Sequence, residues 1–274
     1  MGSNGLSVMV LEVYKAMNTQ KKQSEWQWQW NKMYDDNLWL FTEWISPNKL
    51  EDFKDKEVLD CGCGGGQHLN FIAPYCKKAI GIDLNTPEIA RRNTEENKNI
   101  EVIEGDIASI KLDKKFDIVY SIGVLHHTDN PTKSFVNIKS FVKKGGKVIV
   151  WVYSHEGNFL NRTVLEFLKR CCFLRLSKNI LWILSNIITL LIYIPIYTVY
   201  LLPLKFLPFY YYFQNWRKLG FKRNNMNVFD KLNAPQTFFI KRGTIEEWFN
   251  SDEFSDIHIS SYKGVSWRAS GSLK

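Results

Sequence analysis

The feature that most constrains this fold is a short apolar run that ends in a cluster of glycines. Glu57–Cys61 is followed directly by G-C-G-G-G at residues 62–66, and Gln67–Tyr75 has the composition of a helix. Glycines allow a tight turn and let a ligand approach the backbone closely. A strand, a glycine loop and a helix in this order are typical of a parallel α/β sheet, although the loop alone also fits a plain strand-to-helix turn.

Similar units follow along the chain. Strands are predicted at 78–83, 100–104, 116–122 and 147–153, with helices beginning near Pro87 and covering 133–142. Near the C-terminus, 255–263 alternates like a strand with Ile257 and Ile259 on one face, and 265–269 could pair with it as a hairpin. Alternating strands and helices of these lengths predict a mostly parallel sheet with helices on both faces.

Two acidic residues stand where predicted strands end. Asp83 lies 21 residues after Gly62, a spacing at which a carboxylate can accept hydrogen bonds from both ribose hydroxyls of a nucleoside. Asp106 follows the third strand and could accept from an adenine amino group. The loop spacing G-x-G-x-G differs from the G-x-G-x-x-G of dinucleotide sites, which disfavours a nicotinamide-dependent oxidoreductase, the alternative on a similar fold.

These segments together resemble the ordered motifs of class I S-adenosylmethionine-dependent methyltransferases. V-L-D-C-G-C-G-G-G at 58–66 resembles their first motif, Gly81–Asp83 the second, Gly105–Ile107 the third, and 116–121 with 124–127 the fourth. The resemblance implies a Rossmann-like seven-stranded, mostly parallel sheet with helices on both faces. It places the core at 55–154 and the last two strands at 236–274.

The resemblance also implies which residues hold S-adenosylmethionine. Separately, we expect no metal ion at the site, because C-x-C alone, without a second ligand pair, is a weak zinc signal. The methionine part would lie on the glycine loop, the ribose and adenine on the next two strand ends, and the methyl-donor side on the fourth strand. The residues, in chain order, are Asp60, Cys61, Gly62, Cys63, Gly64, Gly66, Gln67, Asp83, Leu84, Asp106, Ile107, Ser121 and Ile122.

The candidate general bases are His126 and His127, just after the fourth strand. A base is needed only when the methyl acceptor must lose a proton, as a hydroxyl does. In ubiquinone-pathway O-methyltransferases, to which this region is distantly similar, a histidine stands at the place of His127, but the acid before it is His126 here. This departure disfavours their metal-assisted chemistry. Either histidine could instead orient its loop or bind substrate.

The regular pattern stops after Tyr153, and we assign 155–235 to a basic, hydrophobic, helical insertion. Residues 162–223 contain ten basic residues and one acidic residue, in a chain of net charge +8. Residues 179–204 are uncharged and could in length cross a bilayer. The C-terminal strands must rejoin the sheet, so we expect a hairpin or interfacial helices touching a membrane through 179–216, with Pro195 breaking the helix. The alternative is a soluble helical cap over the active site.

The remaining expectations concern the N-terminus and the substrate. Residues 1–54, rich in aromatics such as Trp26, Trp30 and Tyr34, would form a helical lid over the pocket or simply pack on the core. Y-x-x-E-G-N at 153–158 and the tail 264–268 resemble methyltransferases found with glycan or lipid-linked saccharide biosynthesis. We expect a small-molecule, lipid-linked, glycan-like or quinone-like acceptor, methylated at O or N. A nucleic acid, the other possible acceptor, is disfavoured as a partner.

The localisation is expected to be the cytoplasm, with association to the cytoplasmic membrane face. The five cysteines show no disulfide pattern, and we see no signal peptide.

Overall fold

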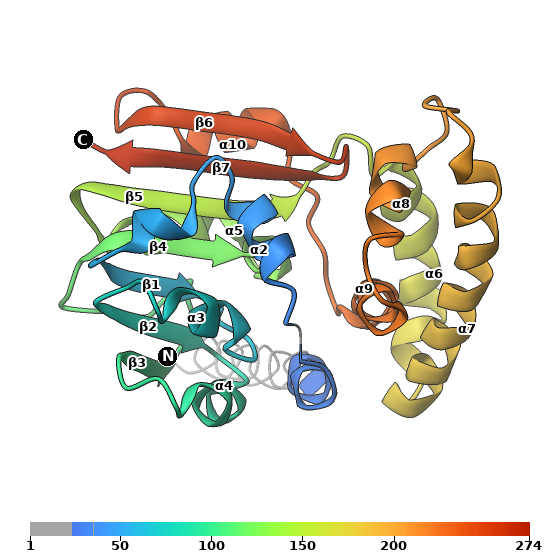
Figure 1. The fold of residues 1–274 in the computed structure, drawn as a ribbon, viewed down its shortest axis with the longest axis horizontal. Helices are drawn as coiled ribbons and strands as arrows, with labels where there is room; N and C mark the ends of the chain where they lie inside the picture. Colours follow the sequence, from blue (N-terminus) through green and yellow to red (C-terminus); the bar gives the residue numbers. More distant parts are fainter. Residues whose placement is uncertain (1–23, 35) are drawn as a thin grey trace, which may run out of the picture.

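A seven-stranded sheet in the order β3-β2-β1-β4-β5-β7-β6 organises the chain, shown in Figure 1. The computed structural model describes residues 24–34 and 36–274, so the expectations about residues 1–23 and 35 lie outside the described residues. All neighbouring strands pair in parallel except β7, which runs antiparallel to β5 and β6. The strands are β1 (Glu57–Cys61), β2 (Lys78–Asp83), β3 (Ile100–Glu104), β4 (Phe116–Ile122), β5 (Val142–Tyr153), β6 (Phe254–Tyr262) and β7 (Ser266–Leu273). The predicted Rossmann-like class is confirmed.

Helices cover both faces of this sheet, and each face has its own apolar cluster. Central strands covered on both sides need continuous apolar runs rather than alternation, and Val58–Cys61 is buried throughout. The covering helices are α2 (Leu38–Ile45), α3 (Gln67–Ile72), α4 (Pro87–Thr94), α5 (Pro131–Lys139) and α10 (Arg242–Trp248). Helix α5 begins two residues before the predicted start, because Pro131 suits a first turn and the Asn130 side chain accepts from the Lys133 amide at 2.9 Å.

The C-terminal hairpin forms as predicted, with one correction. The register shifts between Ser255 and His258, so the strand is bulged there. A bulge reverses the alternation of side chains along a strand. Ile257 is therefore exposed while Ile259 packs against the core, and the expectation that the two share a face is wrong.

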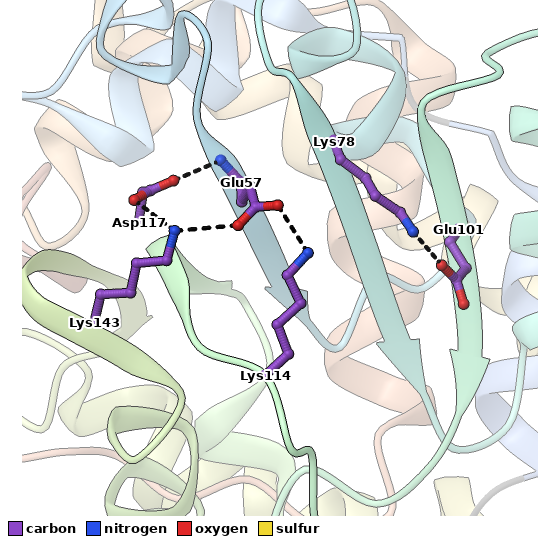
Figure 2. A network of polar contacts seen from close by, with 6 residues as sticks. All are labelled: Glu57, Lys78, Glu101, Lys114, Asp117 and Lys143. Atoms are coloured by element: carbon purple, nitrogen blue, oxygen red, sulfur yellow. Dashed lines mark hydrogen bonds and ion pairs between the residues drawn. The ribbon is translucent and has the colours of Figure 1, made fainter.

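The amino-terminal ends of the central strands are held by ion pairs (Figure 2). The Glu57 carboxylate contacts the ammonium groups of Lys114 at 2.8 Å and Lys143 at 3.1 Å, and Lys143 also lies 3.0 Å from Asp117. The two lysines lower the pKa of Glu57 to about 2. This charged network lies at the edge opposite the strand ends where ligands bind in such sheets, so we assign it to the scaffold.

The insertion forms a helical layer beyond the carboxyl ends of the strands (Figure 1). It contains a π-helical turn (Asn161–Leu165), α6 (Glu166–Cys171), α7 (Lys178–Ile196), α8 (Tyr210–Trp216) and α9 (Phe221–Asn233). Its apolar cluster includes Trp28 from the N-terminal helix at 24–32. Helix α7 ends one residue after Pro195. Among the described residues, α7 is the one helix whose length and composition would allow it to cross a membrane.

Candidate cofactor and acceptor site

A cavity of about 340 Å³ lies between the carboxyl ends of the strands and the helical insertion. One side of it is formed by the glycine loop and by the residues that follow β2, β3 and β4. The other side is formed by the end of β5, by α8 and by α9. The insertion thus completes the cavity that the sheet begins, as a cap over its open edge.

Ten of the fifteen predicted site residues line this cavity, and they come from four separate segments. They are Gly62, Cys63, Gly64, Gln67, Asp83, Leu84, Asp106, Ile107, Ile122 and His127. The other five lie outside the lining, namely Asp60, Cys61, Gly66, Ser121 and His126. Their roles toward a ligand are therefore indirect in this structure.

Asp60 lies near the end of β1, two residues before the glycine loop, and outside the cavity lining. It is buried on β1, and its Oδ2 atom accepts a hydrogen bond from the Tyr120 hydroxyl at 2.9 Å. Burial raises the pKa of Asp60 to about 8, so at neutral pH the carboxyl group is largely protonated. Ser121 has a comparable place, because its hydroxyl donates to the Cys61 carbonyl at 2.8 Å.

Asp83 holds the glycine loop in its open turn. Its Oδ2 atom accepts from the Gly64 amide at 2.9 Å, and its Oδ1 atom accepts from the amides of Asn85 and Thr86, both at 3.0 Å. Gly64 has φ of +54°, and a Cβ there would lie 2.9 Å from the Trp30 ring. Glycine is therefore required at this position, because Trp30 of the N-terminal helix at 24–32 packs directly on it.

The residues on this side of the cavity fit S-adenosylmethionine. Asp83 and Asp106 line it, and no Lys or Arg from residues 24–130 does so within the described part of the chain. A sulfonium cation with an α-amino group suits such an acidic, aromatic surface, whereas a phosphate would need basic groups. The glycine loop with Gln67 would hold the methionine part, Asp83 the ribose and Asp106–Ile107 the adenine.

His127 lies in the cavity wall, and a backbone carbonyl fixes the orientation of its ring. Its Nδ1 atom lies 2.9 Å from the Gln236 carbonyl oxygen, which can only accept, so Nδ1 carries the proton. The Nε2 atom is then unprotonated. Burial lowers the pKa of His127, although the Asp230 carboxylate opposes this, and the neutral ring can accept a proton at pH 7. The Trp26 ring packs 4.9 Å from the His127 ring, centroid to centroid.

His126 lies behind this wall. It is 1% exposed and packs between the rings of His127 and Tyr153, each 4.2 Å away between centroids. Burial places its pKa well below the usual value. Of the two candidate bases, the geometry favours His127.

The N-terminal helix at 24–32 connects the glycine loop to the insertion. Gln29 donates to Asp230 of α9 at 3.0 Å, and the Asp230 carboxylate also accepts from the Tyr153 hydroxyl at 3.2 Å. Trp28 stacks on Phe229. Trp26, Gln29 and Trp30 line the cavity, so this helix forms part of its wall, and its role as a lid stays a prediction.

Sequence reasoning missed the polar residues on the insertion side of the cavity. Arg223, Asp230 and Lys231 on α9 line it with Tyr153 and Tyr212. The Lys231 ammonium group lies over the rings of Tyr153, at 5.5 Å, and Tyr212, at 5.3 Å. In the sequence, the only indication of these residues was the return of charged residues after the apolar segment. The sequence of α9 is otherwise that of an ordinary surface helix.

The Y-x-x-E-G-N segment at 153–158 and the tail at 264–268 meet at the base of the insertion. Trp267 donates to the Glu156 carboxylate at 3.3 Å, and the Asn158 side chain donates to the Val265 carbonyl at 2.7 Å. Gly157 lies so close to Gly264 that a Cβ would come 1.8 Å from the Gly264 carbonyl oxygen. Y-x-x-E-G-N therefore fixes the point where the insertion leaves the sheet.

Comparison with known proteins supports the class that this fold and site define. Residues 59–150 match the family model described as "Methyltransferase domain". A tRNA U34 carboxymethyltransferase of Actinobacillus pleuropneumoniae serotype 7 (strain AP76) is 28% identical over 144 residues, which is 48% of this chain and 45% of that protein. A putative methyltransferase 235L of Invertebrate iridescent virus 6 is 33% identical over 114 residues, covering 40% and 42%. The chain thus spans less than half the length of these curated relatives.

A solved structure shows the same fold over most of the chain. It is an O-methyltransferase family protein from Burkholderia thailandensis, with a TM-score of 0.53 and 11% identity, covering 86% of this chain and 56% of that one. The chain contains a class I S-adenosylmethionine-dependent methyltransferase domain, and its cofactor is S-adenosylmethionine.

One expectation about partners is overturned by these relatives. We expected a nucleic acid to be disfavoured, because the basic residues flank an apolar segment. Several curated relatives are named for tRNA U34, so the exclusion of nucleic acid is wrong. Flanking charge alone does not separate an anionic lipid surface from an anionic polynucleotide, since both attract lysine and arginine.

Proposed function

We propose that this protein transfers a methyl group from S-adenosylmethionine to an oxygen or nitrogen of an acceptor held under the helical insertion. The observation that carries the proposal is the position of His127, whose tautomer leaves Nε2 unprotonated in the wall of the cavity that the glycine loop also lines. Donor and acceptor would share this one cavity, and positioning them together supplies much of the acceleration in such a displacement.

The chain's own residues provide the proton chemistry. When bound, S-adenosylmethionine supplies an electrophilic methyl group. His127 Nε2 accepts the proton of an acceptor hydroxyl as the new O–CH₃ bond forms, and the Gln236 carbonyl keeps the ring oriented through Nδ1. The negative charge of Asp230 favours the protonated ring that results. Trp26 packs on the His127 ring and Trp30 on the glycine loop, and both would limit the access of water to these groups.

The insertion side of the cavity suits an acceptor that is ring-shaped and polar. Aromatic side chains such as Tyr153 and Tyr212 offer flat surfaces, and Lys231 and Arg223 offer positive charge. A lipid-linked, glycan-like or quinone-like molecule combines these properties. These residues support an acceptor of that kind. Association with the cytoplasmic membrane face is supported instead by the exposed apolar side chains of α7.

Substitution of His127 tests the proposed base. His127→Gln should lower the methylation rate by about 10²- to 10⁴-fold while the affinity for S-adenosylmethionine, measured by calorimetry, stays the same. His155→Gln is the matched control, because His155 lies outside the cavity lining. Cell extracts incubated with labelled methyl donor, followed by mass spectrometry, would supply the acceptor. An unchanged rate in His127→Gln would remove the base from the mechanism.

A nucleic-acid acceptor is the second candidate. It is favoured by the relatives named for tRNA and by the ten basic residues at 162–223. It predicts RNA binding whose affinity falls steeply with salt, in proportion to the phosphates contacted. Gel-shift titrations with transfer RNA at 50 and 200 mM salt measure this directly. Absence of binding at low salt would leave the small-molecule acceptor alone.

A further inference from the structure

Helix α7 carries an apolar face that no part of the described chain covers. The side chains at 180, 183, 187, 190, 191 and 194 are each at least half exposed, and they recur at the three- and four-residue spacing of one helix face. We refer to these six residues as the outer face. Leu201, Leu202 and Phe206 extend the exposed apolar surface beyond the helix, with Phe206 80% exposed.

The opposite side of α7 is fixed to α9, so the outer face cannot turn inward. The Thr189 hydroxyl lies 3.2 Å from the Asn225 side-chain oxygen, and the Asn224 amide donates to the Tyr193 hydroxyl at 2.9 Å. Leu181 and Ile196 are buried in the apolar cluster of the insertion. Figure 1 shows α7 as the outermost helix, on the far side of the insertion from the sheet.

Charge in the segment that carries the outer face is almost all of one sign, although Glu25 of the N-terminal helix pairs with Lys178 at the start of α7, at 2.6 Å. The only acidic residue between Phe159 and Asn227 is Glu166, which is paired with the buried Lys169. Arg170 and Arg175 precede α7, Lys205 follows it, and all three are exposed. A row of aliphatic side chains rimmed by bases complements a surface that is apolar inside and anionic at its edge.

We infer that the outer face of α7 docks on an anionic lipid bilayer, with the helix lying in the plane of the interface. The hydrogen bonds and buried side chains that hold α7 against α9 favour this orientation over one that crosses the bilayer. A polynucleotide would use the bases but would leave the aliphatic side chains in water. The inference of membrane docking is argued from the outer face and the bases near it, and it does not depend on the proposed methyl transfer.

The location of the cavity gives this docking a consequence that does rest on the proposed function. Helices α8 and α9 line the cavity, while α7, which packs on α9, presents the outer face on the other side of the same layer. When the protein is docked through α7, the helical insertion that caps the cavity would lie close to the membrane surface. An acceptor with a lipid anchor could then reach the cavity while its chains stay in the bilayer.

Vesicle binding by the whole protein tests the inference. The protein is floated with vesicles of neutral phosphatidylcholine, and with vesicles in which about a third of the lipid is anionic phosphatidylglycerol, without detergent. Two substitutions on the outer face, Ile183→Glu with Leu190→Glu, should lower the partition coefficient at least about 100-fold. Arg175→Gln with Lys205→Gln should lower it about 30-fold on anionic vesicles only.

A matched variant controls for the added charge. Val136→Glu with Ile257→Glu changes two exposed apolar residues elsewhere on the molecule and should bind vesicles like the unmodified protein. Calorimetry with S-adenosylmethionine should give the same affinity for all variants, which separates failure of docking from failure of the site. No flotation of the unmodified protein overturns the inference. Self-association of the protein in solution through the outer face would also overturn the inference. The same holds if transfer RNA abolishes vesicle binding while the double variant Ile183→Glu with Leu190→Glu still binds vesicles.

Discussion

Gly157 offers the sharpest test of how the insertion is attached, because its backbone approaches another turn too closely for any side chain. Gly157 has φ of +77°, and a Cβ built there would lie 1.8 Å from the carbonyl oxygen of Gly264. Real Cβ contacts essentially never fall below 3.0 Å, so in Gly157→Ala the two turns must separate by more than 1 Å. The insertion would then pull away from the start of β7.

The magnitude follows from the bonds that cross this junction. The Ser154 amide and the Asn158 side chain both donate to the Val265 carbonyl, at 3.1 and 2.7 Å. Loss of buried hydrogen bonds costs about 1–3 kcal/mol each, and an alanine held in the left-handed region adds about 1 kcal/mol. We therefore expect Gly157→Ala to lower the free energy of unfolding by about 3–7 kcal/mol.

Gly145→Ala is the matched control for this change. Gly145 has nearly the same φ, +76°, but nothing lies within 4 Å of a Cβ there. It should lose only about 1 kcal/mol from the backbone conformation. Urea unfolding followed by tryptophan fluorescence would measure both variants, with a midpoint about 1 M lower for Gly157→Ala. Equal losses in the two variants would refute the close-approach argument.

Two further predictions concern the carboxylates before and beside the glycine loop. Asp83→Ala should abolish S-adenosylmethionine binding in calorimetry, because the Gly64 amide loses its acceptor and the cavity loses a carboxylate. The control is Asp113→Ala, which should bind the cofactor normally because Asp113 lies outside the cavity lining. Asp60→Asn should gain stability relative to the unmodified protein as pH rises from 5 to 8. The folded-state pKa of Asp60 is raised to about 8, so its stabilisation is present at low pH and is lost as pH rises, by up to about 1.4 kcal/mol per pH unit. Parallel pH profiles of unfolding for the two proteins would contradict the raised pKa.

The sheet could be predicted closely because its signals are local. Each central strand is a continuous apolar run between a turn and a loop, and β1 through β4 begin and end where the sequence predicts. Strand β5 begins at Val142 rather than at 147, because Phe116 pairs with Val142 across a register shift that sequence alone does not reveal. The exposure of Ile257 has the same origin, since a bulge is set by the pairing of two strands.

The half of the site formed by the glycine loop could be predicted from the sequence for the same reason. The half formed by the insertion could not. Gly64 and Asp83 stand at fixed places relative to strand ends, so their meeting follows from the sheet itself. Asp230 reaches Tyr153 and Gln29 only because α9 folds back over the strand ends, across more than 70 residues of chain. Such contacts depend on how helices pack, which hydrophobic periodicity does not specify.

The insertion therefore has two faces with different chemistry, and this constrains the acceptor more than any single residue does. Its inner side presents Tyr212, Lys231 and Arg223 to the cavity, and its outer side presents aliphatic side chains. A freely soluble acceptor would require only the inner side of the insertion. The exposed apolar face would then favour aggregation of the protein without contributing to its function. An acceptor bearing both a polar ring and a lipid anchor accounts for the two sides together. For this reason the vesicle experiment also bears on the substrate, because loss of docking should slow methylation of an anchored acceptor and leave that of its water-soluble head group unchanged.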